Sequence, residues 1–284
     1  MKKSLLKILF FTIISSHIFI SKSLKAFIPY YYFPETKRLH KQGLSIGKEA
    51  YQLLYFGQIE DSLNLAKLAV KMNNTNETLW SILAETQIAN KLYDDALISL
   101  NNAQTINPKI GEIYFAKSTI YLKQSKIKKA KISLQSGIKI LPKNFKAIFQ
   151  LGNIYLMEKN YERAIKEFDK AIKIKKNFWQ AINNQGLAYF EQNKINLSII
   201  SFKKAIELEE NAEPLLALAS CLINKDINKA IVLAKKALNK NPNYVDFNYR
   251  KEQLWGEKLQ LSTEKLMENP KLKKEVLFAK MKIK

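Results

Sequence analysis

Apolar residues between positions 145 and 178 fall into two stretches with a spacing of three or four residues, separated by the polar residues 158–160. This periodicity predicts two amphipathic helices joined by a short turn. Small residues fall where two such helices would touch most closely, with Gly152 on the first helix and Ala164 and Ala171 on the second. The segment therefore predicts a helical hairpin with tight antiparallel packing.

The hairpin pattern recurs every 34 residues along the chain. The two small positions of the second helix recur as Ser62, Ala96, Ala130, Ala164 and Ser198, and as Ala69, Ala103, Gly137, Ala171 and Ala205. The position between them is Ala66, Leu100, Leu134, Phe168 and Phe202. Pro108 and Pro142 fall where a proline can end the second helix. A fixed period of this length indicates a helical repeat array.

Over residues 44–243 this pattern resembles the tetratricopeptide repeat (TPR) family. The resemblance implies an all-α fold, an α-solenoid of tetratricopeptide-type helical hairpins, and a non-enzymatic protein–protein interaction scaffold. Four positions depart from the family pattern. Gln87 replaces an aromatic residue, Gln185 replaces an apolar one, and Lys176 and Glu210 stand where a proline is usual.

Residues 44–244 are expected to form six hairpins, of which the sixth is two residues short. Ser198 and Ala230 occupy the same repeat position but lie 32 residues apart instead of 34, and the deletion is expected near residues 224–226. Residues 245–284 are expected to form a C-terminal capping helix, at about 246–261, followed by a basic tail. The tail is expected to be a frayed, solvated end, with a short amphipathic helix on an acidic surface as the alternative.

The amino-terminal residues 1–26 predict a signal peptide or a signal-anchor. Lys2, Lys3 and Lys7 precede an uncharged apolar run, which has the length of a secretory signal and is short for a membrane span. We expect a cleaved signal, a mature start between residues 22 and 27, and export to a periplasm or thylakoid lumen. The alternatives are a membrane anchor formed by residues 5–21 and a buried helix. Residues 27–43 are expected to be an aromatic lead-in, extended over 27–35 and helical from Thr36.

Four segments make the resemblance more specific. Residues 29–39, 181–187, 212–219 and 243–259 are similar to an exported TPR protein of cyanobacteria. By analogy, this resemblance implies an assembly helper at an exported or photosynthetic-membrane site.

The chain carries a net charge of +22, but only three of its 47 basic residues are arginine. Its richness in Lys, Asn and Ile is typical of A/T-rich codon usage, whereas phosphate recognition favours arginine. A local basic cluster lies across one inter-helix turn and consists of Lys123, Lys126, Lys128, Lys129 and Lys131. The alternative function is therefore a binder of an anionic surface, acidic lipid or nucleic acid, through residues 123–131 and the basic tail. Export disfavours nucleic acid as a partner.

No catalytic motif or metal-ligand spacing occurs in the sequence. The single cysteine, Cys221, allows no disulfide within one chain, and we expect it to be a core residue. The expected protein has no catalytic residue, no cofactor and no metal.

In TPR-like arrays the first helices of successive hairpins line the concave face, which holds a peptide or protein partner. The residues that fall on this face, here called the inner-face residues, are Phe115, Thr119, Leu122, Phe149, Asn153, Leu156, Asn183, Asn184, Leu187 and Phe190. The paired amides of Asn183 and Asn184 are poor helix formers, which favours a binding role. Phe149 stands where TPR clamps for acidic chaperone tails carry a lysine, so that type of clamp is not expected.

Overall fold

The computed structural model describes residues 35–283 and divides the chain into two units, residues 1–41 and residues 42–284. In the first unit, residues 36–41 form the start of helix α2 (Thr36–Tyr55). The predicted signal segment, residues 1–26, and the aromatic stretch that ends at residue 34 lie outside the described residues.

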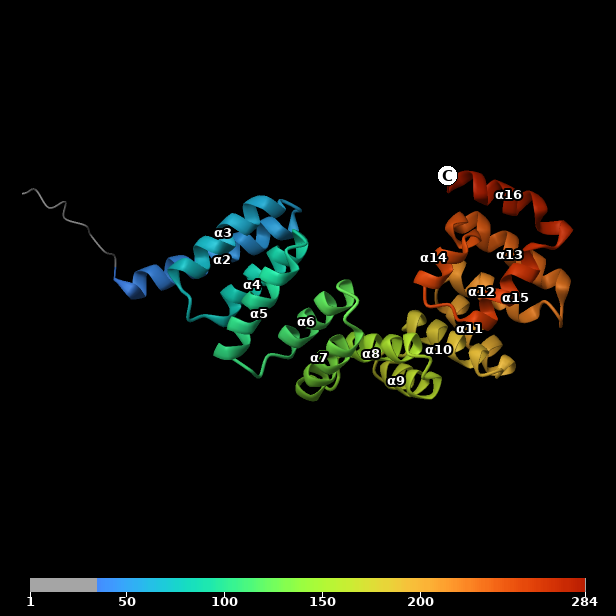
Figure 1. The fold of residues 1–284 in the computed structure, drawn as a ribbon, viewed down its shortest axis with the longest axis horizontal. Helices are drawn as coiled ribbons and strands as arrows, with labels where there is room; N and C mark the ends of the chain where they lie inside the picture. Colours follow the sequence, from blue (N-terminus) through green and yellow to red (C-terminus); the bar gives the residue numbers. More distant parts are fainter. Residues whose placement is uncertain (1–34, 284) are drawn as a thin grey trace, which may run out of the picture. The chain divides into compact units, whose positions relative to one another are not determined.

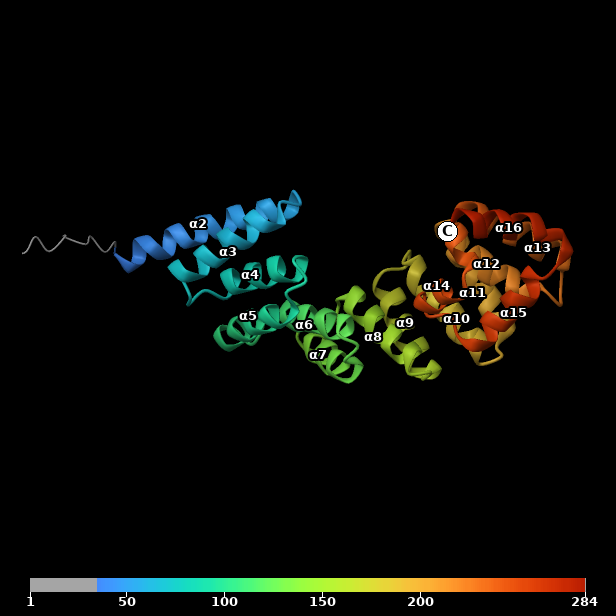
Figure 2. The same cartoon turned by 45° about the horizontal axis from the view of Figure 1, so that its top comes forward.

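The described residues contain twelve helices that pair into six hairpins and contain no strand, which confirms the predicted all-α solenoid of helical hairpins (Figures 1 and 2). The first helices are α2, α4 (Glu77–Ala89), α6 (Gly111–Lys123), α8 (Phe145–Met157), α10 (Trp179–Glu191) and α12 (Ala212–Leu222). The second helices are α3 (Ile59–Met72), α5 (Tyr93–Ile106), α7 (Ile127–Ile140), α9 (Tyr161–Ile174), α11 (Ile195–Leu208) and α13 (Ile227–Lys240).

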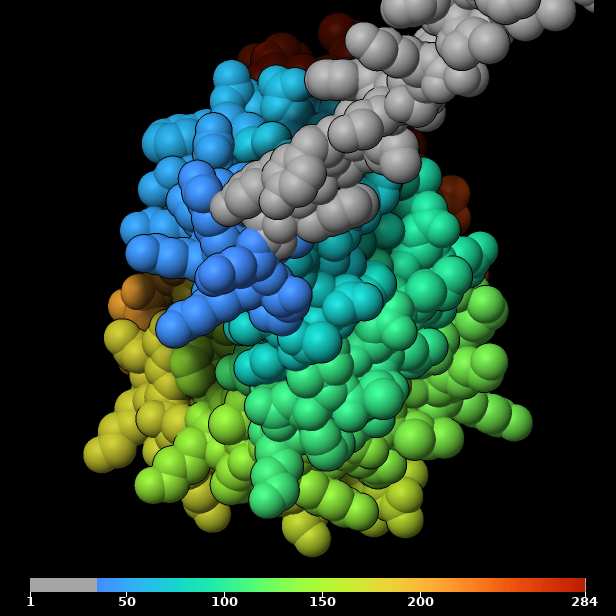
Figure 3. All heavy atoms as spheres, turned by 90° about the vertical axis from the view of Figure 1, so that its left-hand side faces the viewer, coloured from blue at the N-terminus to red at the C-terminus, as the bar shows by residue number. Residues whose placement is uncertain are grey.

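The hairpins are tight because glycine or alanine stands where the two helices meet. A Cβ atom added to Gly152 would lie 2.5 Å from the Phe168 ring, and one added to Gly186 would lie 2.7 Å from the Phe202 ring. Ala164 on α9 has no exposed surface. The large ring of one helix therefore fills the space above a small residue of the other, as close packing requires. The atoms of successive hairpins, coloured from cyan to green, lie in contact in Figure 3.

The first five inter-helix turns share one backbone geometry. At intervals of 34 residues the chain adopts a left-handed conformation with φ between 57° and 78°, at Gly57, Lys91, Ser125, Lys159 and Asn193. In the fourth turn the Asn160 N–H donates to the Tyr155 carbonyl at 2.8 Å and closes the end of α8. This helix-ending motif usually carries glycine at the left-handed position. Of these five turns, only the first has a glycine there, Gly57.

The two missing residues of the sixth hairpin shorten its first helix. Helix α12 has 11 residues, whereas α4, α6, α8 and α10 each have 13. The Asp226 side chain then accepts a hydrogen bond from the Lys229 N–H at 3.0 Å and caps α13. The deletion is therefore absorbed before the second helix begins.

The predicted continuous helix over residues 246–261 is wrong. The structure has a 3-10 helix η1 (Pro242–Val245), then α14 (Phe247–Glu252), and after a corner α15 (Glu257–Met267). The chain turns because Leu254 adopts a left-handed conformation with φ 66°. The expectation of a frayed tail is also wrong, since a 3-10 helix η2 (Pro270–Leu272) leads into α16 (Lys273–Lys282).

Candidate functional site

The inner-face residues lie on α6, α8 and α10, as the repeat phase requires, but they differ in exposure. Those on α6 are half-buried, as are Phe149 and Asn153 on α8. Leu156 is buried, and Phe115 packs against Gly137 of the same hairpin, where an added Cβ would lie 2.4 Å from its ring. The inner-face residues on α10 are 0–8% exposed and consist of Asn183, Asn184, Leu187 and Phe190.

An open cavity of about 430 Å³, here called the aromatic pocket, lies over α8 and the start of α10. Phe149 and Phe178 meet edge-on with ring centroids 5.0 Å apart, and Phe145 lies 5.1 Å from Phe178. The Lys175 ammonium lies 5.0 Å from the centroid of the Phe145 ring. The full lining is Phe145, Lys146, Phe149, Gln150, Asn153, Lys175, Phe178 and Gln180. The pocket thus combines apolar rings with amides and two lysines.

A chain of side-chain amides links α8 to α10. The Asn184 amide donates to the Asn153 Oδ1 at 2.8 Å, and the Asn183 amide donates to the Asn184 Oδ1 at 3.1 Å. Of the two asparagines flagged from sequence, Asn183 retains a buried Oδ1 with no hydrogen-bond partner among the described residues. These amides therefore bridge two first helices, which explains why poor helix formers stand there.

Helix α15 packs on α10 and α12, and the α10 inner-face residues are buried. The Ser262 hydroxyl donates to the Ser220 carbonyl at 2.8 Å, and the hydroxyls of Ser220 and Thr263 lie 2.7 Å apart. Leu259 and Leu266 have no exposed surface. The chain's own C-terminal helix therefore packs against α10, and Phe190 and Ser262 of α15 line the same open cavity of about 190 Å³.

Glu191, at the end of α10, caps α15 from a distant part of the chain. Its buried carboxylate accepts hydrogen bonds from the backbone N–H of Leu259 at 3.0 Å and of Lys258 at 3.4 Å. A Cβ atom added to Gly256 would lie 2.2 Å from the Glu191 Cδ, so only glycine allows this approach. A negative charge at a helix N-terminus is favourable. No repeat-position argument points to Glu191.

A second open cavity, here called the corner pocket, lies between the end of α8 and the corner that joins α14 to α15. It has a volume of about 420 Å³, and its walls include Leu156, Met157, Phe247, Leu254 and Trp255. An exposed ion pair of Lys159 and Glu257, 2.7 Å apart, lies beside it. The inner face of α8 thus borders two cavities.

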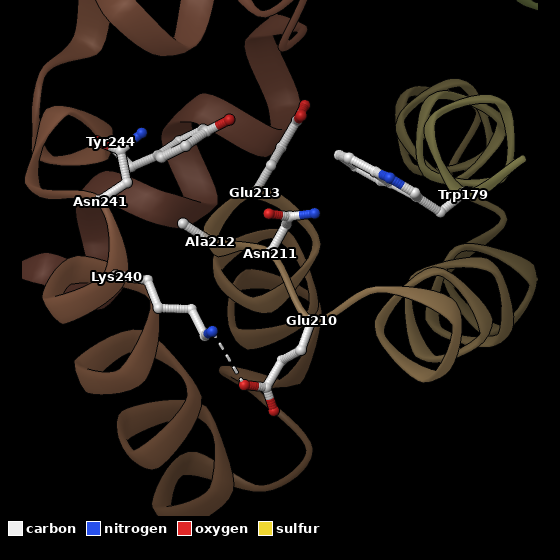
Figure 4. A pocket seen from close by; sticks show the side chains of 8 residues that line it. All are labelled: Trp179, Glu210, Asn211, Ala212, Glu213, Lys240, Asn241 and Tyr244. Atoms are coloured by element: carbon white, nitrogen blue, oxygen red, sulfur yellow. Dashed lines mark ion pairs between the residues drawn. The ribbon is translucent and has the colours of Figure 1, made fainter.

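Glu213, in the first turn of α12, holds the C-terminal segment through its carboxyl group. The Trp255 indole N–H donates to its Oε1 at 3.2 Å. Burial raises the pKa of this carboxyl to about 7, and hydrogen bonds with Trp255, Asn183 and Tyr244 partly offset that rise. The residue as a whole is half-buried because it borders a cavity of about 380 Å³. Figure 4 shows Trp179 on one side of this cavity and Tyr244 on the other.

The predicted basic cluster is partly engaged by neighbouring side chains. Lys131 pairs with Glu158 at 2.6 Å and lies 5.5 Å from the centroid of the Tyr155 ring. Lys129 lies 5.8 Å from the centroid of the Tyr121 ring. Lys123, Lys126, Lys128 and Lys129 are nevertheless exposed.

Among residues 35–283, no three His, Cys, Asp or Glu side chains are placed to hold a metal ion. In the same part of the chain, no helix is both long and apolar enough to cross a membrane. Cys221 is buried, and burial raises the pKa of its thiol to about 12.

Residues 145–178 and residues 180–211 each match a family model described as Tetratricopeptide repeat. The chain therefore contains tetratricopeptide repeats over these residues. No curated protein matches the sequence.

Solved structures with the same fold include the protein MamA, which is 25% identical, with 56% of this chain and 93% of that chain covered at a TM-score of 0.53. PilF of Pseudomonas aeruginosa is 14% identical over 77% of this chain and 98% of its own, with a TM-score of 0.63. YrrB, described as a TPR protein with an unusual peptide-binding site, is 17% identical, with a TM-score of 0.52. The match covers 62% of this chain and 92% of YrrB.

Proposed function

We propose that this protein is a non-enzymatic scaffold that binds a protein or an extended peptide on the inner face of α6 and α8. The aromatic pocket carries this proposal, because an apolar cavity bordered by amides is suited to a side-chain anchor and its flanking peptide groups. The similarity to YrrB, a TPR protein with a peptide-binding site, supports the same function.

Within this pocket the aromatic rings and the polar groups have different roles. Phe145, Phe149 and Phe178 would contact an apolar or aromatic side chain of the partner. Asn153 would hydrogen-bond the partner's backbone. Lys146 is exposed, and an acidic residue next to the anchor would be attracted to it.

The proposed contact surface includes only some of the ten inner-face residues. Phe115, Thr119 and Leu122 on α6 and Phe149 and Asn153 on α8 retain exposed surface. The inner-face residues of α10 are buried, on a helix against which α15 packs.

A pull-down from native cells after crosslinking tests the site. Phe149→Ala shortens a wall of the pocket, and Lys175→Glu reverses a charge at its edge. Both variants should lose the same partner while their circular dichroism spectra stay unchanged. Ile132→Ala is the matched control, because Ile132 is an apolar residue that is 63% exposed on the second helix α7. If both pocket variants retain the partner at the control level, the site is wrong.

We propose that this scaffold is exported to a periplasm or thylakoid lumen. There it would be an assembly helper at an exported or photosynthetic-membrane site, either free or anchored by residues 5–21. The basis is the sequence of residues 1–26. Mass spectrometry of the protein from native cells should find a start between residues 22 and 27. An intact amino terminus in the soluble cytosolic fraction would contradict export.

The second candidate function is binding of an anionic surface, acidic lipid or nucleic acid, through residues 123–131 and the basic tail. The exposure of Lys123, Lys126, Lys128 and Lys129 favours it. Retention on a polyanion column should then fall steeply with salt. Replacement of these four lysines by glutamine should weaken retention to the level that the basic tail supplies, and unchanged retention would exclude the cluster.

A further inference from the structure

Helix α16 carries apolar residues on two opposite faces. Val276 and Ala279 face inward and are 9% and 1% exposed. Leu277, Phe278 and Met281 are 53%, 51% and 68% exposed. At roughly 100° per residue, these three side chains centre about 180° from the inward pair. They form an apolar ridge that points away from the helices on which α16 packs.

Lysines border this apolar ridge on both sides. By the same helical spacing, Lys273 and Lys280 fall along one edge and Lys282 along the other, while Lys274 lies within the ridge, and all four are exposed. The Lys282 ammonium lies 4.4 Å from the centroid of the Phe278 ring. The helix therefore presents large apolar side chains and positive charges on the same outward face.

The negative charge on this helix is already engaged. Glu275 pairs with Lys235 of α13 at 2.8 Å, and this pair holds α16 against the solenoid. Residues 271–283 contain five lysines and this single acidic residue. Since no other carboxylate lies on the helix, the outward face attracts anions.

A membrane surface fits this arrangement better than a protein groove does. The ridge is convex, so its side chains can enter the boundary between lipid headgroups and acyl chains without a matching cavity. Long lysine side chains can extend from the edges to anionic headgroups. Helix α16 has 10 residues and is too short to span a bilayer, so it would lie along the surface.

We propose that α16 docks on the surface of a membrane that contains anionic lipids. Leu277, Phe278 and Met281 enter the interface, and the four lysines contact the headgroups. This docking rests on the tail part of the second candidate function, and it can hold while the polyanion-binding role of residues 123–131 fails. It is independent of the aromatic pocket.

A fluorophore on α16 of the full-length chain tests this docking. Met281→Cys would carry a thiol-linked, environment-sensitive dye. The natural Cys221 is buried and has a raised pKa, so it reacts slowly. The dye emission should shift to the blue on phosphatidylglycerol-containing vesicles, stay unchanged on phosphatidylcholine vesicles, and lose its shift at about 1 M salt. The matched control is Leu261→Cys on α15, where Leu261 is 71% exposed.

Replacing the four lysines by glutamine in the labelled chain should weaken vesicle binding by at least about tenfold. Replacing Leu277 and Phe278 by serine should abolish the blue shift. Because the dye reports only its own surroundings, membrane binding by residues 1–26 alone gives no shift at position 281. The proposal is overturned if position 281 shows no shift on anionic vesicles, an equal shift on neutral ones, or the same shift as position 261.

Discussion

Replacing Glu191 by alanine is expected to loosen α15 without unfolding the hairpins before α8. The side chain is 6% exposed, and its carboxylate accepts the N–H groups of Leu259 and Lys258. Only the Leu259 contact, at 3.0 Å, has the length of a strong hydrogen bond. One charge-assisted hydrogen bond and the loss of a helix cap amount to about 2 kcal/mol.

The Lys258 ammonium limits this loss. It donates to the Glu191 backbone carbonyl at 2.7 Å and to the Asn193 Oδ1 at 3.1 Å, and both contacts survive the substitution. Glu191→Gln keeps one oxygen to accept the Leu259 N–H, and loses the charge at the helix N-terminus and the acceptor of the longer Lys258 contact. It should therefore cost about 0.3–1 kcal/mol, which makes it the matched control.

Amide hydrogen exchange followed by mass spectrometry measures the effect locally. About 2 kcal/mol corresponds to a roughly 30-fold faster exchange of the α15 amides, while those of α4 to α7 keep their wild-type rates. Unchanged exchange in α15, or equal acceleration in all hairpins, would refute the assignment of Glu191 as the cap of this helix.

Three further predictions concern the turns, the buried carboxyl and the hairpin packing. Ser125 and Gly57 both have a left-handed backbone, which glycine adopts without strain. Ser125→Gly should therefore raise the free energy of unfolding by about 1 kcal/mol in chemical denaturation, and Gly57→Ala should lower it by about the same amount. Changes of the same sign would contradict this. Burial raises the pKa of Glu213 to about 7 in the folded protein. Between about pH 4.5 and 7 its carboxyl is therefore protonated in the folded protein and ionised in the unfolded chain. Stability should fall by at most about 3 kcal/mol as pH rises through this window, and Glu213→Gln should flatten that decline in pH-dependent melts. Ala164→Phe should cost about 1–3 kcal/mol by overpacking α8 against α9, and an unchanged melting temperature would show that the hairpin packing is misassigned.

The repeat pattern was sufficient to predict the hairpins. Small residues such as Ala164 recur every 34 positions, and each one marks a helix–helix contact, so period and phase together fix most helix bounds. Neighbouring helices in a solenoid are neighbours in sequence, which makes their packing a local problem. In four of the first five turns the left-handed residue followed the same period without the glycine that usually reveals it.

The C-terminal segment could not be predicted in this way, because its contacts are distant in sequence. The corner at Leu254 leads into Gly256, whose neighbour Glu191 belongs to the fifth hairpin. A helical apolar pattern across residues 246–261 therefore suggested one helix where the chain forms two. A short amphipathic helix was the alternative expectation for the tail, but α16 carries two opposite apolar faces, so the sequence did not show that Val276 and Ala279 pack inward.

Asn183 and Asn184 were predicted to bind a partner because asparagine is a poor helix former. In the structure their amides instead make hydrogen bonds within the protein. Their amides connect α8 to α10 by way of Asn153. The sequence showed that helix-unfavourable amides needed an explanation, and it did not show that both would be buried and bonded to each other.

The packing of α15 on α10 and α12 changes the order in which the hairpins are expected to unfold. In a simple solenoid each hairpin contacts only the hairpins beside it, so the ends can open one at a time. Here α15 contacts both α10 and α12, and α16 contacts α13, which ties the last two hairpins to the segment that follows them. Residues from α10 to α16 should therefore unfold as one cooperative block, whereas the hairpins of α4 to α7 lack this tie and can open in smaller steps.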